Sequence, residues 1–136
     1  MFREASPVDR DQVIALWQAC GLTREWNNSV RDFDFALACT TSTILVHEIG
    51  AQIVATVMVG HDGHRGAIYY LAVAPEHQKE GFGRTAMNAA EDYLKEHGVW
   101  KINLMIRNEN AAVQGFYKAI GYQTNAVISM GTVLVK

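Results

Sequence analysis

The sequence has few of the residues that mark secreted, fibrous or disordered proteins. Cysteine and proline each occur only twice among 136 residues. A disulfide between Cys20 and Cys39 is one interpretation, but two reduced thiols fit the sequence better. The spacing of the two cysteines is not that of a metal site. With 49% hydrophobic and 19% charged residues, the composition excludes a disordered chain and predicts a globular one.

The sequence also has no run of basic residues and no long apolar run. Its formal net charge is -2, and binding to a phosphate backbone usually needs a basic face, so nucleic acid is not an expected partner. No apolar stretch approaches the ~20 residues that cross a bilayer. Residues 1–12 carry charges where a secretory signal has an apolar core. We therefore expect a cytoplasmic protein without a membrane partner.

No linker, repeat or low-complexity stretch interrupts the chain, so we expect residues 1–136 to form a single domain. A first helix is predicted to begin at Ser6 and Pro7 and to end at Gly21, because serine caps helices, proline is tolerated in the first turn and glycine ends them. Apolar residues recur at helical spacing between these ends: Val13, Leu16, Trp17 and Cys20. A second helix is predicted from about Ser29 to Cys39.

The middle of the chain predicts an antiparallel meander. Two apolar segments, 44–49 and 53–59, flank Gly50 and are typical of a hairpin. After a polar turn over residues 61–66, the segment 67–73 is apolar on both faces, as in a central buried strand. Residues 1–5 are also compatible with a short edge strand.

The pattern changes after Pro75. We expect a helix from Gly81 to about His97, a strand from Trp100 to Ile106, a last helix over residues 110–120 and two strands within 122–135. Strand, helix and strand in this order form a crossover unit with parallel strands. The predicted fold class is therefore α+β: a mixed sheet, antiparallel at first and then joined by an α/β crossover, with helices on both faces.

The most informative segment is the loop from Gln78 to Arg84, which follows a buried strand and opens a helix. The first turn of a helix has unpaired N–H groups and the positive end of the helix dipole. Gly81 and Gly83 let these groups approach a ligand closely. The loop therefore predicts an anion site suited to a pyrophosphate, with Gln78 and Arg84 as further donors.

Two other interpretations of this loop compete. Residues 81–86 fit the dinucleotide pattern, but that motif needs a parallel first strand and an acid about 20 residues later. Here the preceding strand belongs to an antiparallel meander and the following strand ends without an acid, so this interpretation fails. In the other interpretation, the glycines only form a tight turn. The local sequence favours this turn and the anion site about equally.

The wider pattern favours the anion site. The motif Gln78-x-x-Gly81-x-Gly83 is followed by Asn110-x-x-Val113-x-x-x-Tyr117 and then by Gly121-Tyr122. In this order, residues 67–122 resemble the GNAT family of N-acetyltransferases, with Val113 where alanine is more usual. Residues 21–28 and 59–73 are also similar to a subgroup of small bacterial members of unassigned substrate.

The resemblance implies transfer of an acetyl group from acetyl-CoA, without a metal, to a small-molecule or peptide amine. The backbone of Leu71, Ala72 and Val73 is expected beside the pantetheine arm and thioester, in a slot where this strand splays from the next. N–H groups of the loop are expected to hold the pyrophosphate: Gln78, Lys79, Glu80, Gly81, Phe82, Gly83 and Arg84. Asn110 is expected to bond the pantetheine arm, and Tyr117 to face the thioester sulfur.

Amine attack on a thioester requires loss of an amine proton, a donor for the oxyanion and a proton for the leaving thiolate. Tyr117 is the catalytic candidate for the last role, although its place on an apolar stripe also fits a core residue, and the two roles are compatible. The resemblance gives the oxyanion donor as a backbone N–H near Val73.

A general base is not evident. The candidates are His61, Asp62, His64, Tyr69, Tyr70 and Glu109. A water chain to solvent is the preferred hypothesis. The histidines of the 61–66 turn have no further ligand nearby, so a solvated turn fits them better than a metal site. Trp26 fits equally the wall of an acceptor pocket or a plug at the edge of the core.

Three functions remain to be compared. The first is an active acetyltransferase, and the second is a non-catalytic CoA-binding or regulatory domain with the same fold. Asn110 and Tyr117 favour activity, whereas the missing base favours the second. A toxin that acetylates charged tRNA is disfavoured by the acidic balance. The sequence leaves the acceptor and the choice between a monomer and a homodimer open.

Overall fold

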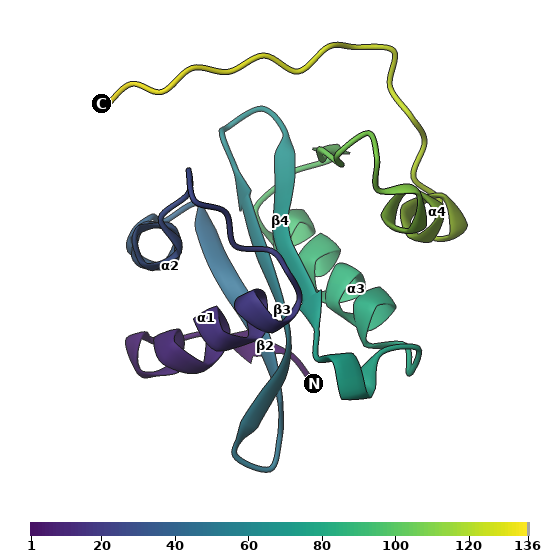
Figure 1. The fold of residues 1–136 in the computed structure, drawn as a ribbon. Helices are drawn as coiled ribbons and strands as arrows, with labels where there is room; N and C mark the ends of the chain where they lie inside the picture. The colour runs from purple at the N-terminus through teal and green to yellow at the C-terminus, as the bar shows by residue number, and fades with distance from the viewer. Residues whose placement is uncertain (136) are drawn as a thin grey trace. The chain divides into compact units, whose positions relative to one another are not determined.

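The computed structural model describes residues 1–135, which form two compact units, Met1–Leu104 and the residues from Met105 onward. The first unit contains a five-stranded sheet in the order β1-β2-β3-β4-β5 (Figure 1). Its strands are β1 (Arg3–Glu4), β2 (Ser42–Ile49), β3 (Gln52–His61), β4 (Gly66–Val73) and β5 (Ile102–Asn103). The first four pair antiparallel, and β4 pairs with β5 in parallel. The predicted meander and crossover are therefore confirmed.

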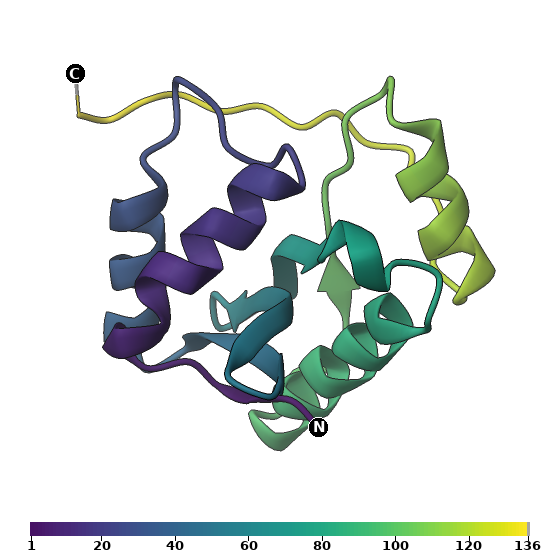
Figure 2. The same ribbon diagram turned by 60° about the horizontal axis from the view of Figure 1, so that its bottom comes forward.

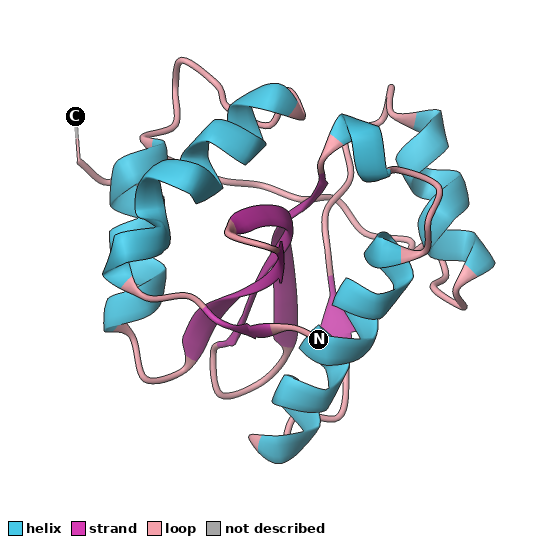
Figure 3. Cartoon of the chain, turned by 90° about the horizontal axis from the view of Figure 1, so that it is seen from below, coloured by secondary structure: helices cyan, strands magenta, loops and turns pink. Residues whose placement is uncertain are grey.

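Helices cover both faces of this sheet (Figure 2). The short helix η1 (Pro7–Asp9), α1 (Arg10–Ala19) and α2 (Ser29–Ala38) lie on one face, and α3 (Phe82–Glu96) lies on the other, after the short helix η2 (Pro75–His77). Figure 3 shows the sheet from below, with helices on both of its faces. The α+β class with helices on both faces is confirmed.

The core beneath α1 and α2 contains most of the apolar stripe that the sequence predicts for the first helix. Val13 and Trp17 of α1 and Phe33 of α2 have no exposed surface. They pack on Ile44 and Val46 of β2. On the opposite face, α3 buries Ala86, Met87, Ala90 and Leu94. Burial of these side chains supplies most of the free energy that holds the sheet and helices together.

The N-terminus of the first helical segment is fixed by an ion pair. Asp9 accepts a hydrogen bond of 2.8 Å from the Ser6 backbone N–H and two bonds, of 2.8 and 3.0 Å, from the Arg3 guanidinium. Arg3 also pairs with Glu48 of β2. Hydrogen bonding to Arg3 lowers the pKa of the Asp9 carboxyl. The predicted cap at Ser6 is thus joined to the sheet edge.

Two sequence predictions are wrong. A strand over residues 100–106 was expected, but β5 is limited to Ile102–Asn103. The two strands expected within residues 122–135 are absent from the described chain. In the second unit, the described residues contain one helix, α4 (Ala111–Ala119), and no strand. A strand without a partner leaves its backbone groups unpaired, so apolar composition alone does not form one.

Among the described residues, no helix has the length and apolar character needed to cross a membrane.

Candidate active site

One edge of β4 is largely unpaired. β4 pairs with β5 only at Gly66 and Ala67. Within the described chain, residues 68–73 therefore have no partner strand on that side. Ala74 donates its N–H to the Val54 carbonyl of β3 at 2.8 Å, and because successive residues of a strand point to alternate edges, the Val73 amide faces the unpaired edge. The structure shows this unpaired edge, and the cofactor slot that the resemblance implies beside it stays a prediction.

A β-bulge lies just before this edge. Met58 pairs with Tyr69 and Thr56 pairs with Ala72, so β4 holds one more residue than β3 over this interval. Tyr70 has a φ angle of +51°, a left-handed conformation that costs free energy for a bulky residue. The bulge redirects the backbone of Leu71 and Val73.

Side chains from three elements hold the bulge in place. The Tyr70 ring stacks on Trp17 of α1 at a centroid distance of 3.8 Å. The Thr56 hydroxyl donates to the Tyr70 carbonyl at 3.0 Å and accepts from Trp17 Nε1 at 3.0 Å. The Tyr70 hydroxyl donates to Oδ2 of Asp32 in α2 at 2.7 Å. The strained residue is thus fixed at its carbonyl, its ring and its hydroxyl.

The end of β4 is tied to two neighbouring segments through the Val73 carbonyl. This oxygen accepts a hydrogen bond from Cys20 Sγ at 3.2 Å and another from Gln78 Nε2 at 3.2 Å. Burial raises the pKa of the Cys20 thiol, so the sulfur stays protonated as a donor at neutral pH. Both cysteines are free thiols. Gln78, expected to face a pyrophosphate, uses part of its side-chain amide to anchor the loop.

The glycine loop has the backbone that the motif predicts. Lys79 and Gly81 have φ angles of +66° and +89°, and Gly81 is the N-cap of α3. Thr85 donates the first intrahelical backbone bond, to the Gly81 carbonyl at 3.1 Å. The N–H groups of residues 82–84 precede this bond and have no intrahelical acceptor, and no side chain caps them or adds an acid to the first turn. This first turn fits a pyrophosphate.

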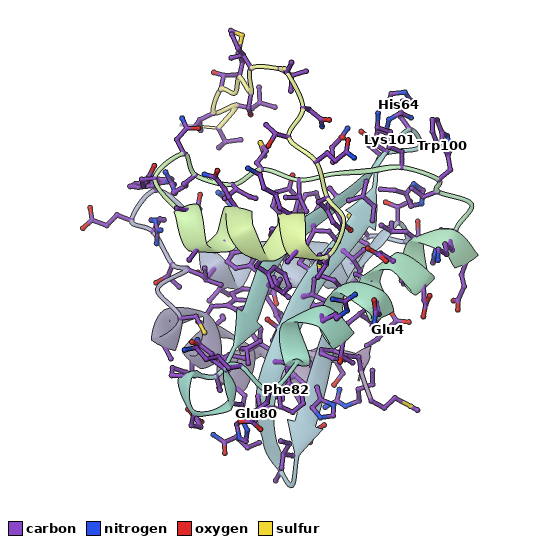
Figure 4. The ribbon with its side chains drawn as sticks, turned by 90° about the vertical axis from the view of Figure 1, so that its right-hand side faces the viewer. Glu4, His64, Glu80, Phe82, Trp100 and Lys101 are labelled. Atoms are coloured by element: carbon purple, nitrogen blue, oxygen red, sulfur yellow. The ribbon has the colours of Figure 1, made fainter. Side chains whose placement is uncertain are left out.

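Phe82 anchors the loop with its side chain. Its ring lies 5.1 Å from that of His47 in β2 and 5.9 Å from that of His77, edge to face. Glu80 Oε2 lies 3.4 Å from His77 Nδ1. Phe82 and Glu80 lie together at one end of the first unit (Figure 4). The ring of Phe82 therefore packs between two imidazoles, and the binding of the cofactor by its backbone N–H stays a prediction.

The polar turn of residues 61–66 lies at the opposite end of β4. Figure 4 places His64 beside Trp100 and Lys101, far from Phe82. The Asp62 carboxylate accepts backbone bonds from His64 and Arg65, each of 2.8 Å, which lowers its pKa. A hollow at this end is lined by the turn and by residues 97–100. In the described chain, no group of three or more His, Cys, Asp or Glu residues could hold a metal.

The second unit holds the two remaining predicted residues. Asn110 is the N-cap of α4, and its Oδ1 accepts from the Val113 N–H at 3.2 Å. Tyr117 is 6% exposed, and burial raises its pKa to about 12. Its ring lies edge to face with Phe116 and Tyr122, at 5.1 and 5.5 Å. The phenol is therefore protonated at neutral pH, as a proton donor must be.

Sequence reasoning missed Asp32 and Cys20 as parts of this region. Asp32 precedes the buried Phe33 by one residue, so it lies at the edge of the apolar stripe of α2, where a carboxylate is usually solvated. Only the packing of α2 on the sheet brings it to Tyr70. Trp26 is 69% exposed, which argues against its role as a plug of the core.

The comparisons with known proteins agree on one family. The sequence profile of the acetyltransferase (GNAT) family matches residues 9–122. The chain belongs to this family. A Yersinia pestis acetyltransferase is 39% identical over 127 residues, which cover 93% of this chain and 90% of the relative.

Solved structures show the same fold at low sequence identity. AAC(6')-Iy, in complex with a bisubstrate analogue, CoA-S-monomethyl-acetylneamine, has a TM-score of 0.83 at 11% identity, over 98% of this chain and 97% of that chain. A predicted acetyltransferase of Clostridium acetobutylicum with acetyl-CoA has a TM-score of 0.78 at 19% identity, over 96% and 95% of the two chains. These structures show the fold, and the family match over residues 9–122 confirms the resemblance of residues 67–122 to GNAT enzymes.

Membership of the GNAT family makes the chain an acetyl-CoA-dependent N-acetyltransferase, with acetyl-CoA as its acetyl donor. The competing interpretation of the glycine loop as a Rossmann motif is excluded by the antiparallel strand before it.

Proposed function

We propose that this GNAT protein transfers the acetyl group of acetyl-CoA to a primary amine, by direct attack of the amine on the thioester. One observation carries the proposal. The unpaired edge of β4 ends at Val73, and Gln78 binds the Val73 carbonyl and so joins this edge to the loop that opens α3. A thioester slot and a pyrophosphate site thus adjoin within one unit.

The cofactor roles follow from this arrangement. We assign the pantetheine arm to the backbone of Leu71, Ala72 and Val73, and the pyrophosphate to the N–H groups from Gln78 to Arg84. Asn110 can still offer its side-chain NH₂ to the pantetheine arm, because its cap bond uses only Oδ1. We also propose that both units act as one catalytic domain, since the family match spans them.

The catalytic steps use few protein groups. The neutral amine attacks the thioester carbon, and the resulting oxyanion accepts a hydrogen bond from the Val73 N–H. The C–S bond then breaks, and Tyr117 donates its phenolic proton to the leaving thiolate. The amine nitrogen loses its extra proton to water, and the phenolate of Tyr117 regains one from water.

The histidines of the 61–66 turn do not fit the role of general base. Val73 is seven residues further along β4 than Gly66, which corresponds to about 23 Å at ~3.3 Å per residue. A base at His61 or His64 could not reach an amine near Val73. Burial and then the hydrogen bond to Asp32 raise the pKa of Tyr70 to about 12, so its phenolate is scarce at neutral pH. A water chain remains our preferred base.

The acceptor class is supported only in outline. A neighbouring fold, AAC(6')-Iy, is an aminoglycoside N-acetyltransferase, and another is an N-acetyltransferase of the alanine of ribosomal protein S18 from Escherichia coli. An aminoglycoside and an alanine of a ribosomal protein therefore both occur as acceptors among proteins of this fold. The second candidate function, a non-catalytic CoA-binding domain, is favoured only by the lack of an evident base.

Calorimetric titration with acetyl-CoA, with NAD as the control, tests the cofactor site. We expect acetyl-CoA to bind and NAD not to bind. Thiol release from acetyl-CoA in the presence of primary amines then separates the two candidate functions. Binding without thiol release from any amine supports the non-catalytic domain, and absence of acetyl-CoA binding contradicts both.

A further inference from the structure

The carboxylate of Asp32 is half-buried and has no cationic partner among the described residues. Its Oδ2 accepts the Tyr70 hydroxyl at 2.7 Å. Among residues 1–135, no Lys, Arg or His nitrogen lies within ion-pair distance of it; the ion pairs hold other carboxylates: Asp9, Glu48, Asp34 and Glu80. Asp34, two residues further along α2, is paired with Arg10 at 3.1 Å. Because no side-chain cation of the described residues pairs with this half-buried carboxylate, it can take a cationic ligand.

The Tyr70 hydroxyl does not neutralise this charge. With a pKa of about 12, Tyr70 is a neutral phenol at physiological pH. It donates one hydrogen bond and leaves the full negative charge on the carboxylate. The phenol thus orients Asp32 without removing its attraction for a cation.

The pair stands on a rigid frame. Tyr70 is fixed by stacking on Trp17 at 3.8 Å and by the bond from Thr56 to its carbonyl. Trp17 and Thr56 have no exposed surface and are joined by their own hydrogen bond. A carboxylate oriented by such a frame selects ligands by geometry as well as by charge.

Asp32 and Tyr70 also lie on the face of the sheet that α1 covers, and the C-terminal end of α1 contacts the last residue of β4. The Cys20 thiol, at the end of α1, reaches the Val73 carbonyl at 3.2 Å, and Tyr70 packs on Trp17 of the same helix. Tyr70 precedes Val73 by three residues, which corresponds to at most about 10 Å along the strand. An acceptor molecule of modest length can therefore contact Asp32 and reach Val73.

The position of Asp32 decides which group it binds. Its carboxylate is held by Tyr70, three residues before Val73, so the group bound at Asp32 differs from the amine that attacks a thioester near Val73. We propose that Asp32, oriented by Tyr70, binds a second ammonium group of the acceptor, so that the substrate is a diamine or polyamine. This inference rests on the proposed function, because it assumes that the thioester lies near Val73.

Binding of two matched amines tests the proposal. Hexamethylenediamine and heptylamine have similar length and one amine in common, and differ in that an ammonium group replaces a methyl group. Each is titrated by calorimetry into the protein saturated with CoA. We expect the diamine to bind about tenfold more tightly than heptylamine to the wild-type protein. Equal binding of the two amines, or no binding of the diamine, overturns the proposal without any variant.

Two variants locate the effect. Asp32→Asn keeps the shape of the side chain and an acceptor for Tyr70, and we expect it to bind the two amines within about twofold of each other. Asp34→Asn removes a carboxylate from the same helix and should keep the tenfold preference. If Asp32→Asn folds, as measured by its near-ultraviolet circular dichroism, and retains the preference, the second ammonium binds elsewhere and the proposal is wrong.

These readouts are separate from the test of the proposed function. A protein that binds acetyl-CoA and releases thiol with amines, but shows no preference for the diamine, is an acetyltransferase with another acceptor class. A protein that binds the diamine through Asp32 but never acetylates it contradicts the proposed reaction instead.

Discussion

The side-chain amide of Gln78 donates a hydrogen bond of 3.2 Å to the carbonyl oxygen of Val73. The first residue of the glycine loop is therefore joined to the last residue of β4. The GNAT motif thus supplies more than a row of N–H donors, because its first side chain joins the segment proposed to bind the pyrophosphate to the strand edge proposed to bind the thioester. A change in the loop should accordingly alter cofactor affinity more than it alters global stability.

Gly81→Ala tests this relationship. Gly81 has a φ of +89°, and an alanine there costs about 1–2 kcal/mol or forces the loop to another conformation. We expect the Kd for acetyl-CoA to rise about tenfold, measured by calorimetry. Gly50→Ala is the matched control, because Gly50 in the β2–β3 turn has a φ of +64°. It should lower the melting temperature and leave the Kd unchanged; an equal rise in Kd for both variants contradicts the assignment.

Tyr117→Phe tests the proton donor. The change removes one hydroxyl from a buried ring, so the packing with Phe116 and Tyr122 should persist. We expect kcat for thiol release to fall by about 10²-fold or more, while the Kd for acetyl-CoA changes little. Tyr122→Phe makes the same chemical change in the same unit and should leave kcat near the wild-type value. A wild-type rate for Tyr117→Phe removes this residue from the mechanism.

The sequence predicts well those features that depend on local chemistry. Ser6 begins a helical segment, Gly50 forms the hairpin turn, and Gly81 opens α3, because each residue supplies a backbone conformation or a hydrogen bond that acts within a few residues. Val13, Leu16 and Trp17, from the stripe predicted for the first helix, likewise lie in the core.

Features that depend on distant residues were missed. No local pattern indicates that Tyr70 adopts a left-handed conformation, because the strain is supported by Trp17 and Asp32 from two helices. The two strands predicted within residues 122–135 failed for a similar reason. Val127 and Ile128 are apolar enough for a strand, but a strand forms only beside a partner, and the partner is not encoded in its own residues.

Asp9→Asn should destabilise the protein at neutral pH and not in acid. The hydrogen bonds to Arg3 lower the pKa of Asp9, so its contribution to stability is present above the ordinary carboxyl pKa of about 4 and is lost as the pH falls through the lowered value. We expect a loss of about 1–3 kcal/mol at pH 7. Urea unfolding at several pH values measures it. A gap between the two proteins that does not narrow below about pH 4 contradicts the role of this ion pair.

Tyr70→Phe should flatten the alkaline decline in stability. Burial, followed by the hydrogen bond to Asp32, raises the pKa of Tyr70 to about 12 in the folded state, whereas an unfolded tyrosine titrates near 10. Between about pH 10 and 12 the unfolded chain therefore releases this proton first, and the free energy of unfolding falls as the pH rises. The phenylalanine variant lacks the proton and should show a shallower slope in this window, measured by urea unfolding. Tyr69→Phe is the control, because Tyr69 is 47% exposed and its removal should leave the slope closer to that of the wild-type protein. Equal slopes for Tyr70→Phe and the wild type would mean that the phenol of Tyr70 is solvated, and that the frame which orients Asp32 is looser than the structure shows.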